Sequence, residues 1–257
     1  MFNIFDYPVK KITLFFEYIG QYLMLMVKMF RSIDSLSNYS INIIDQMIII
    51  GSKSIPIVLI TSFFSGMVTS VQGAYQMTTT LVPKWYIGGI VGESVILELA
   101  PMITGLVLAG RVGANIAAEI GTMRVTEQID ALETLSLDPV AYLVVPRVLA
   151  GLVMFPVLVI IANFCGIFGG LLACLSTLDI NSYQFMKGVK SWFNPWDAVF
   201  GLIKSIHFGF AITSIACYFG FYTTGGAQGV GKATMNTVVA SCVTIVILDY
   251  LLAEILL

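Results

Sequence analysis

The stretch that decides the fold is GRVGANIAAEIGTMRVTEQIDALETLSLDP, residues 110–139, because it concentrates charge between two long apolar runs. It contains two basic and five acidic residues: Arg111, Arg124, Glu119, Glu127, Asp130, Glu133 and Asp138. Of the 257 residues in the chain, 58% are hydrophobic and only 11% are charged, whereas soluble domains carry roughly 25% charged residues. We therefore predict an integral membrane protein in which this stretch joins two membrane-spanning helices.

Five apolar segments are long enough to cross a bilayer, which takes about 20 mostly apolar residues. They cover about residues 54–75, 94–117, 142–175, 198–222 and 235–256. Pro146 and Pro156 predict kinks in the third segment. The predicted fold is all-α, with residues 54–257 forming a domain of about five transmembrane helices.

Residues 7–31 are apolar but carry one polar stripe. At about 100° per residue, the stripe consists of Lys10, Glu17, Gln21, Lys28 and Arg31. This pattern predicts an amphipathic helix lying in the membrane interface, with a sixth span as the alternative. Residues 1–53 would then form this interfacial helix and a linker.

Lysine and arginine set the orientation, because cytoplasmic segments are enriched in them. With five spans and a cytoplasmic N-terminus, the inside segments hold Lys10, Lys11, Lys28, Arg31, Lys53, Arg111, Arg124, Arg147 and Lys232. The outside segments hold only Lys84, Lys187 and Lys190, and Lys204 lies within or near the fourth span. We predict a cytoplasmic N-terminus, an external C-terminus and a cytoplasmic position for the charged stretch.

The charged stretch has two faces if residues 119–135 form one helix. Glu119, Asp130, Glu133 and, at the edge, Glu127 share the acidic face, while Val125, Ile129 and Leu132 share the apolar one. A helix that rests on anionic lipid should be basic, so this acidic helix favours contact with a protein. A solvated loop helix is the alternative.

The span before the charged stretch carries small residues at every fourth position: Gly105, Ala109, Gly113, Ala117 and Gly121. Small residues at this spacing let helix backbones approach closely in a membrane. Gly88-x-x-x-Gly92 and Gly166-x-x-x-Gly170 repeat the pattern elsewhere. The stripe predicts tight packing, either within one subunit or between two.

Glu98 is a carboxylate well inside a predicted span, where a charge costs roughly 2.5–3.5 kcal/mol on insertion scales. It should face a cavity, a partner or a substrate group, or else form a structural hydrogen bond between helices. Pro101 follows one turn later and frees a backbone carbonyl nearby.

Other chemical signatures are weak. The four cysteines lie in apolar runs without metal-ligand spacing, so we expect small core residues and no metal site. His207 is the only histidine and is expected to be a packed polar group. GAQGVGKA, residues 226–233, resembles a phosphate-binding loop, but Ala233 replaces the hydroxyl residue and no strand precedes it. We expect a flexible cytoplasmic turn and no ATP hydrolysis by this chain.

The stretch ELAPMITGLVLAGRVGANIAAEIGTMRVTEQIDALETLSLDPVAYLVVPRVLAG, residues 98–151, resembles the signature region of the MlaE/YrbE family. With flanking segments the resemblance covers about 200 residues. Members of this family are permease subunits of lipid-transporting ABC systems that work with MCE proteins. The resemblance implies a homodimer in the bacterial cytoplasmic (inner) membrane, moving phospholipid or a related lipid.

The resemblance also implies partners and roles. Each copy would dock a subunit of an ATPase dimer, which binds the ATP and Mg²⁺, through a coupling helix at about 119–135. A periplasmic MCE protein would exchange lipid with the permease, and some systems add a STAS-domain protein; no cofactor of its own and no nucleic acid are expected. The coupling residues would be Glu119, Arg124, Val125, Glu127, Ile129, Asp130, Leu132 and Glu133.

One departure from the family concerns the cavity. The family often has Arg-Glu-Leu-Gly-Pro where this chain has Leu97-Glu98-Leu99-Ala100-Pro101. Leu97, Glu98 and Pro101 are the candidate cavity residues, but Leu97 cannot pair with the glutamate or with a lipid phosphate. An ion-paired headgroup site at this position is therefore in question.

Two other classes of protein are weighed against a non-catalytic permease. An ATP-independent channel or secondary transporter would show polar residues along several spans, and this chain offers mainly Glu98, Arg111 and Asp249. An intramembrane enzyme would need a nucleophile and a base at membrane depth, which a single histidine without an acid cluster does not provide.

Overall fold

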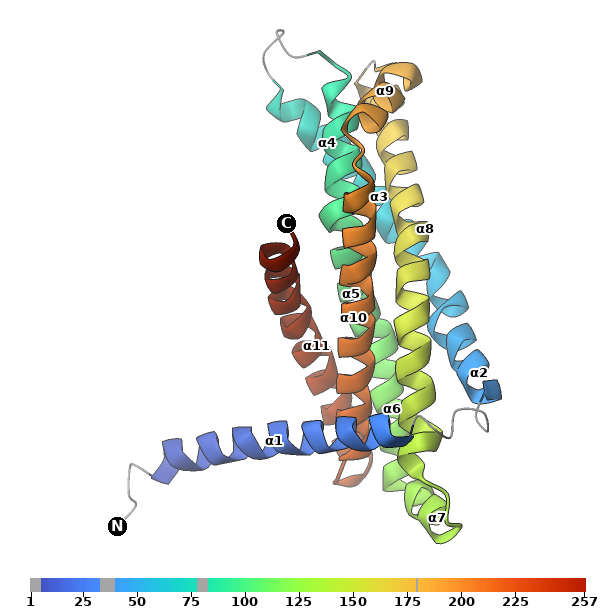
Figure 1. Cartoon of the computed structure of the whole chain (residues 1–257), viewed down its shortest axis with the longest axis vertical. Helices are drawn as coiled ribbons and strands as arrows, with labels where there is room; N and C mark the ends of the chain where they lie inside the picture. Colours follow the sequence, from blue (N-terminus) through green and yellow to red (C-terminus); the bar gives the residue numbers. More distant parts are fainter. Residues whose placement is uncertain (1–5, 33–39, 78–82, 179) are drawn as a thin grey trace.

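The computed structural model describes residues 6–32, 40–77, 83–178 and 180–257, and these form a long helical bundle without a strand (Figure 1). The side chains of residues 6–12, 14 and 15 lie outside this description. Five helical stretches are long and apolar enough to cross a membrane: Ser40–Gln76, Tyr86–Val125, Val140–Thr177, Pro195–Phe221 and Gly226–Leu256. The prediction of an all-α membrane protein with five spans is confirmed.

The helical stretch of the first span begins at Ser40, earlier in the chain than the predicted start near residue 54. It consists of α2 (Ser40–Ile50), a short 3₁₀ turn η2 (Ser52–Ser54) and α3 (Ile55–Gln76). Three polar residues of the expected linker line small cavities: Asp45 and Gln46 line one, and Lys53 lines another. Asp45 and Gln46 lie within α2, and Lys53 lies on the 3₁₀ turn that separates α2 from α3.

Two of the other spans contain π-helical turns. The second runs through α4 (Tyr86–Ser94), η3 (Val95–Leu99), α5 (Ala100–Leu108), η4 (Ala109–Gly113) and α6 (Ala114–Val125), in which η3 and η4 are π-helical. The third begins with the π-helical η5 (Val140–Val144) and continues as α8 (Val145–Thr177). Because π-bulges occur frequently at functional sites, the residues on these turns are candidates for a functional site.

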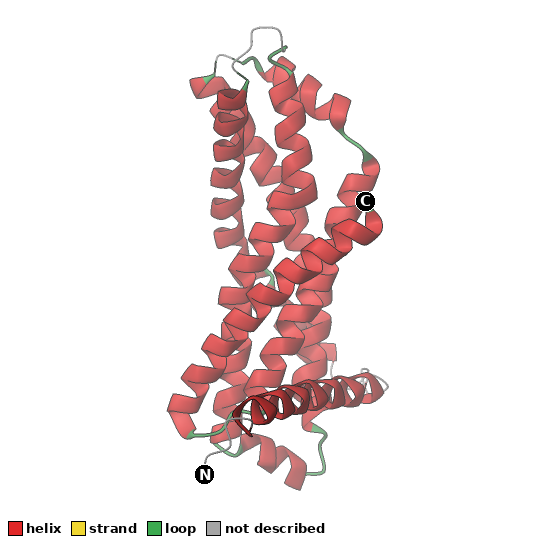
Figure 2. Cartoon of the chain, turned by 90° about the vertical axis from the view of Figure 1, so that its left-hand side faces the viewer, coloured by secondary structure: helices red, strands yellow, loops and turns green. Residues whose placement is uncertain are grey.

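The remaining spans are single helices, α10 (Pro195–Phe221) and α11 (Gly226–Leu256). Short helices cap the two ends of the bundle: α7 (Gln128–Thr134) at one end and α9 (Ser182–Trp192) at the other (Figure 1). The side chains of Asn181 and Asn194 accept hydrogen bonds from the first turns of α9 and α10, which fixes where each helix begins. Figure 2 shows α11 crossing the bundle obliquely along one face.

Helix α1 (Asp6–Arg31) lies across the bundle at the end that carries α7, rather than along it (Figures 1 and 2). One of its faces is buried against the chain through Leu25, Met26 and Met29. An exposed apolar stripe runs along a second face: Phe16, Ile19, Leu23, Val27 and Phe30. This arrangement fits an interfacial helix and not a sixth span, as the polar stripe predicted; Lys10 of that stripe lies outside the described side chains.

Two hydrogen bonds hold α1 against α10. The Tyr22 hydroxyl lies 2.8 Å from Ser214 Oγ, and the Tyr218 hydroxyl donates to Gln21 Oε1 at 3.2 Å. Burial raises the pKa of the Tyr22 phenol, an effect that the Ser214 hydrogen bond opposes. The phenol is protonated at neutral pH, as an unperturbed tyrosine is, and the two hydrogen bonds join the interfacial helix to the bundle.

The small-residue stripe packs inside the chain. A β-carbon at Gly105 would lie 3.2 Å from Phe208, and one at Gly113 would lie 3.3 Å from Ile212 and 3.4 Å from Thr237. Ala109 and Ala117 are fully buried in the same row. The stripe thus packs α10 and α11 against the second span. Of the two alternatives, packing within one subunit or between two, the structure shows packing within one subunit.

Replacing Gly113 by leucine should lower the free energy of unfolding by about 1–3 kcal/mol, because the added side chain has no space between α10 and α11. Gly110→Leu, three residues away on the same helix, is the matched control, since nothing lies within 4 Å of a β-carbon there. Thermal unfolding of the purified chain in detergent measures both. Equal destabilisation by the two substitutions would contradict the packing assigned to the stripe.

Candidate functional site

A buried lysine joins two carboxylates inside the bundle. Lys204 Nζ of α10 lies 2.5 Å from Glu98 Oε2 of η3 and 2.7 Å from Asp249 Oδ1 of α11. The Lys204 side chain is 1% exposed, Asp249 14% and Glu98 43%. The three charges sum to −1, and Glu98 is the member that opens to the outside of the chain. We call these three residues the charged cluster.

Local structure explains how the charged cluster is assembled. The π-helical turn η3 and Pro101, in the first turn of α5, break the regular helical ladder next to Glu98. The Leu97 carbonyl accepts a hydrogen bond from Lys204 Nζ at 3.3 Å. The ammonium also lies 4.7 Å from the centre of the Phe200 ring, where the π face favours a cation.

Lys204 does not interact with its two carboxylate neighbours in the same way. It donates hydrogen bonds to Glu98 and to the Leu97 carbonyl. Asp249 Oδ1, although 2.7 Å away, is buried without a hydrogen bond. Glu98 is therefore hydrogen-bonded to the ammonium, whereas Asp249 Oδ1 lies close to it without a hydrogen bond.

Glu98 pairs with Lys204 of another helix and not with its neighbour Leu97. Leu97 contributes its backbone carbonyl rather than a side-chain charge, and Pro101 is buried beside Gly201. The positive partner that the sequence motif lacks is supplied by Lys204 from a different span. Sequence reasoning missed this pairing; its only signal was a lysine and an aspartate placed inside two later apolar spans.

At the end of the bundle with α7, the predicted single helix over residues 119–135 is wrong. Helix α6 ends at Val125, the chain turns at Thr126 and Glu127, and α7 begins at Gln128. Glu127 adopts a left-handed conformation with φ of 61°, which a continuous helix does not contain. We call residues 124–137 the elbow; α7 extends beyond α1 at this end (Figure 1).

The turn divides the predicted docking residues into separate groups. Ile129 is fully buried in the chain and Leu132 and Val125 are half-buried, so Ile129 offers no surface to a partner. Glu127, Asp130 and Glu133 are exposed, and Asp130 pairs with Arg124 at 2.6 Å. The apolar residues that the elbow exposes are Leu135 and Leu137, at 70% and 40%, which the helical projection did not single out.

Glu119 lies outside the elbow and faces the third span. Its carboxylate accepts from Arg147 Nη2 at 2.9 Å, and Arg147 is 4% exposed. Arg147 Nη1 also donates to the Leu143 carbonyl of η5 at 2.7 Å. The Glu119–Arg147 pair therefore joins α6 to the start of the third span.

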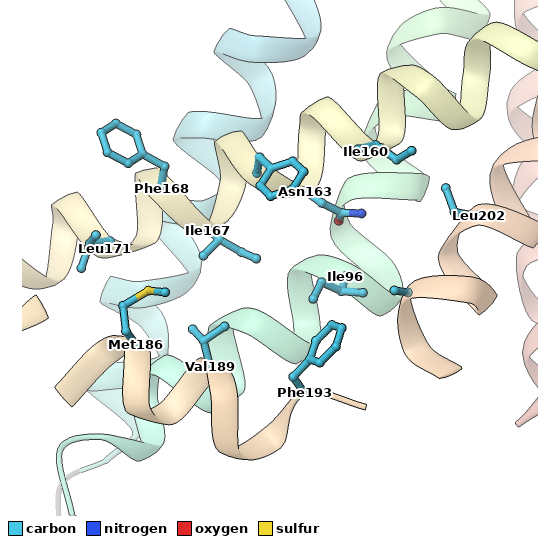
Figure 3. A pocket seen from close by; sticks show the side chains of 12 residues that line it. Ile96, Ile160, Asn163, Ile167, Phe168, Leu171, Met186, Val189, Phe193 and Leu202 are labelled. Atoms are coloured by element: carbon cyan, nitrogen blue, oxygen red, sulfur yellow. The ribbon is translucent and has the colours of Figure 1, made fainter. Parts of the chain in front are cut away.

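A wide apolar pocket lies between α8, α9, α10 and η3 (Figure 3). Its volume is about 530 Å³. Figure 3 shows Phe168, Ile167, Met186 and Phe193 lining it, with Asn163 as the polar side chain. The Asn163 carbonyl oxygen is buried without a hydrogen bond, so the pocket suits an apolar chain with few polar contacts.

Residues 226–233 do not form the expected turn. They make the first two turns of α11, and the chain reverses before them, where Gly225 and Gly226 have φ of 92° and 66°. Among the described residues no group of histidine, cysteine and acidic side chains could hold a metal ion. Cys174 and Cys217 are buried as expected, Cys165 and Cys242 are half-buried, and His207 is exposed with Nδ1 2.8 Å from the Ile203 carbonyl.

Comparison with known proteins places these features in a family. The family model described as Permease MlaE matches residues 43–255. A probable ABC transporter permease protein of Rickettsia conorii is 42% identical over 254 residues, covering 99% of this chain and 98% of that protein. The MlaE permease of the intermembrane phospholipid transport system of Haemophilus influenzae is 35% identical, covering 83% and 82%. The chloroplast protein trigalactosyldiacylglycerol 1 of Arabidopsis thaliana is 39% identical, covering 83% of this chain and 61% of that protein.

Proposed function

Because the chain belongs to the MlaE permease family, we propose that it is the membrane subunit of an ABC transporter that moves phospholipid or a related lipid between the inner membrane and a periplasmic MCE protein. Two copies of the chain would form the pore, and a separate ATPase dimer would bind ATP and Mg²⁺ and drive the movement. The chain itself would be non-catalytic. Its N-terminus would lie in the cytoplasm, with α1 at the inner surface of the membrane.

The charged cluster is the observation that carries the proposal. A fully buried lysine between two carboxylates is rare in a membrane span and marks a functional path by default. Glu98 exposes 43% of its side chain, which leaves it accessible to a second copy or to a lipid headgroup. A zwitterionic or anionic headgroup would compete with the carboxylates for the lysine, and the wide apolar pocket near Ile96 offers space for an acyl chain.

The second copy is supported by the exposure of α11. In its most apolar window only 11% of the residues are buried, against 28–56% in the other four spans. Asp249 lies on this helix, so a partner packed against α11 would stand beside the charged cluster. A dimer cavity lined by both copies would give the lipid a path that a single bundle lacks.

The elbow is the proposed contact with the ATPase. It extends beyond the interfacial helix and exposes carboxylates next to Leu135 and Leu137. Closure of the ATPase on ATP would displace α7, and the Glu119–Arg147 pair would carry the displacement into the second and third spans. The tightly packed stripe would then move α10 and α11 together, changing the geometry of Lys204 and its carboxylates.

The test is to purify the tagged chain from its native membrane in mild detergent, identify co-purifying proteins, and extract bound lipid for mass spectrometry. We expect an ATPase, an MCE-domain protein and phospholipid, with a STAS-domain protein in addition if the system contains one. ATP hydrolysis by the complex should rise when phospholipid is added. An intact complex without an ATPase would contradict the proposal in favour of an ATP-independent channel or secondary transporter.

A further inference from the structure

Two basic residues outside the charged cluster line one small cavity. Lys53 of η2 and Arg111 of η4 border it, together with Asn115 of α6. The cavity has a volume of about 150 Å³, and its other lining residues are apolar: Ile49, Ile50, Val112 and Ile116. No carboxylate lines it. We call it the basic pocket.

The charges of the basic pocket are not neutralised within the described parts of the chain. The four ion pairs among those residues involve Arg124, Arg147 and Lys204, but neither Lys53 nor Arg111. No side-chain hydrogen bond from either residue is present in the same parts. Basic residues inside spans ordinarily pair with an acid or a carbonyl. Arg111 is half-buried and Lys53 and Asn115 are exposed, so the basic pocket presents two positive charges that an anion can reach.

Helix irregularities place both cations at the same level. Lys53 sits on the 3₁₀ turn between α2 and α3, and Arg111 sits on the π-helical η4. Both interruptions turn a basic side chain toward the same cavity, in two spans that are otherwise regular near this level. A regular helix through either segment would give these side chains a different direction.

The basic pocket lies near the level of the interfacial helix. Gly113, two residues after Arg111, packs against Ile212 of α10, and Tyr22 of α1 contacts Ser214 two residues further along α10. Arg111 is therefore about one helical turn from the level of the hydrogen bond that joins Tyr22 of α1 to α10. Ile50 and Ile116, both at most 1% exposed, form an apolar wall beside the cations.

We propose that Lys53, Arg111 and Asn115 bind the phosphate of an anionic phospholipid in the leaflet that contacts α1. Basic pockets between transmembrane helices on the cytoplasmic side suit acidic headgroups, and arginine pairs with phosphate through two parallel hydrogen bonds. The volume is below the roughly 300–1,000 Å³ of a site for a whole drug-sized ligand, which fits a headgroup whose acyl chains stay in the bilayer. The inference rests on the membrane position of the chain and not on lipid being its cargo.

The test compares Lys53→Gln/Arg111→Gln with Lys28→Gln/Arg31→Gln, which removes the same two charges from the exposed side of α1. The probe is dihexanoyl phosphatidylglycerol, titrated into the purified full chain in detergent, with retained native phospholipid measured in parallel by mass spectrometry. We expect the first pair to weaken binding at least about tenfold and the second pair to change it less than about twofold. Unchanged binding in Lys53→Gln/Arg111→Gln would overturn the site.

Two further measurements keep the test decisive. Inorganic phosphate should bind the wild-type chain at least about tenfold more weakly than the short lipid, because it lacks the apolar contacts. Equal affinities would show that the pocket binds a soluble phosphate and would overturn the proposed lipid site. Lys53→Gln alone removes an exposed side chain that the fold does not need, and it should give a partial loss that Lys53→Arg restores. These experiments measure lipid binding and not lipid transport. The basic pocket is therefore tested independently of the proposed transport function.

Discussion

Replacing Lys204 by methionine should abolish lipid transport and lower the thermal stability of the chain. The substitution keeps the length and apolar stem of the side chain but removes the only positive charge between Glu98 and Asp249. Breaking a buried ion pair by removing one partner costs about 3–5 kcal/mol. We expect the low end of that range, about 3 kcal/mol, because Glu98 is partly exposed and can be hydrated.

A triple variant separates the two effects. In Lys204→Met/Glu98→Gln/Asp249→Asn no charge remains in the cluster, so most of the lost stability should return, since apolar or neutral replacements of buried ion pairs are often neutral. Transport should stay at least about tenfold below wild type, because no charge is left to exchange with a headgroup. Lys190→Met, an exposed lysine on α9, is the control for a simple loss of positive charge.

The measurements are thermal unfolding in detergent and lipid transfer by the reconstituted transporter. If the triple variant regains wild-type transport, the charges have no role in the lipid path, and the cluster is a structural ion pair. If Lys204→Met leaves both stability and transport unchanged, the charged cluster is not held together as the distances indicate.

The spans could be predicted from sequence because a bilayer imposes one simple condition, a long apolar run, on each of them. The charged cluster could not, because Lys204 lies 106 residues from Glu98 along the chain, and no local pattern pairs side chains at that separation. A lone lysine in an apolar span signals only that a partner exists. Its identity depends on which helices pack together, and the small-residue stripe, although visible, did not say which helices it would seat.

The predicted single helix over residues 119–135 was wrong for a different reason. A helical projection assumes a continuous helix, and nothing in Thr126-Glu127 is a usual helix breaker. The chain nevertheless turns there, with Glu127 in the left-handed region, so residues on either side of the turn no longer share a face. The opposite error occurred at residues 226–233, where we expected a turn but α11 begins at Gly226. The chain reverses just before, at residues 222–225, and Gly225 and Gly226 have positive φ there.

Reversing the charges of Glu127 and Glu133 to lysine should reduce co-purification of the ATPase at least about tenfold while leaving the chain inserted and folded. Both side chains are exposed on the elbow, and like charges placed across an interface cost several kcal/mol. These two acids test the contact better than Asp130 does, because Asp130 already pairs with Arg124 and its reversal would also disturb the elbow itself. The Arg124–Asp130 pair contributes at most about 1 kcal/mol to stability. Reversing Asp130 would therefore combine a weak effect on folding with any effect on docking.

A control variant separates a specific docking contact at the elbow from a general effect of the chain's net charge on ATPase binding. Glu17→Lys/Asp45→Lys makes the same change of charge at exposed residues of α1 and α2, and it should retain the ATPase if the elbow is the contact. Leu135→Ser should weaken co-purification without any change of charge, because it removes an apolar side chain that is 70% exposed and has no role in the core. Full retention of the ATPase by both the Glu127/Glu133 and the Leu135 variants would mean that the motor contacts another surface. The Glu119–Arg147 pair would then connect two spans without transmitting force from outside the membrane.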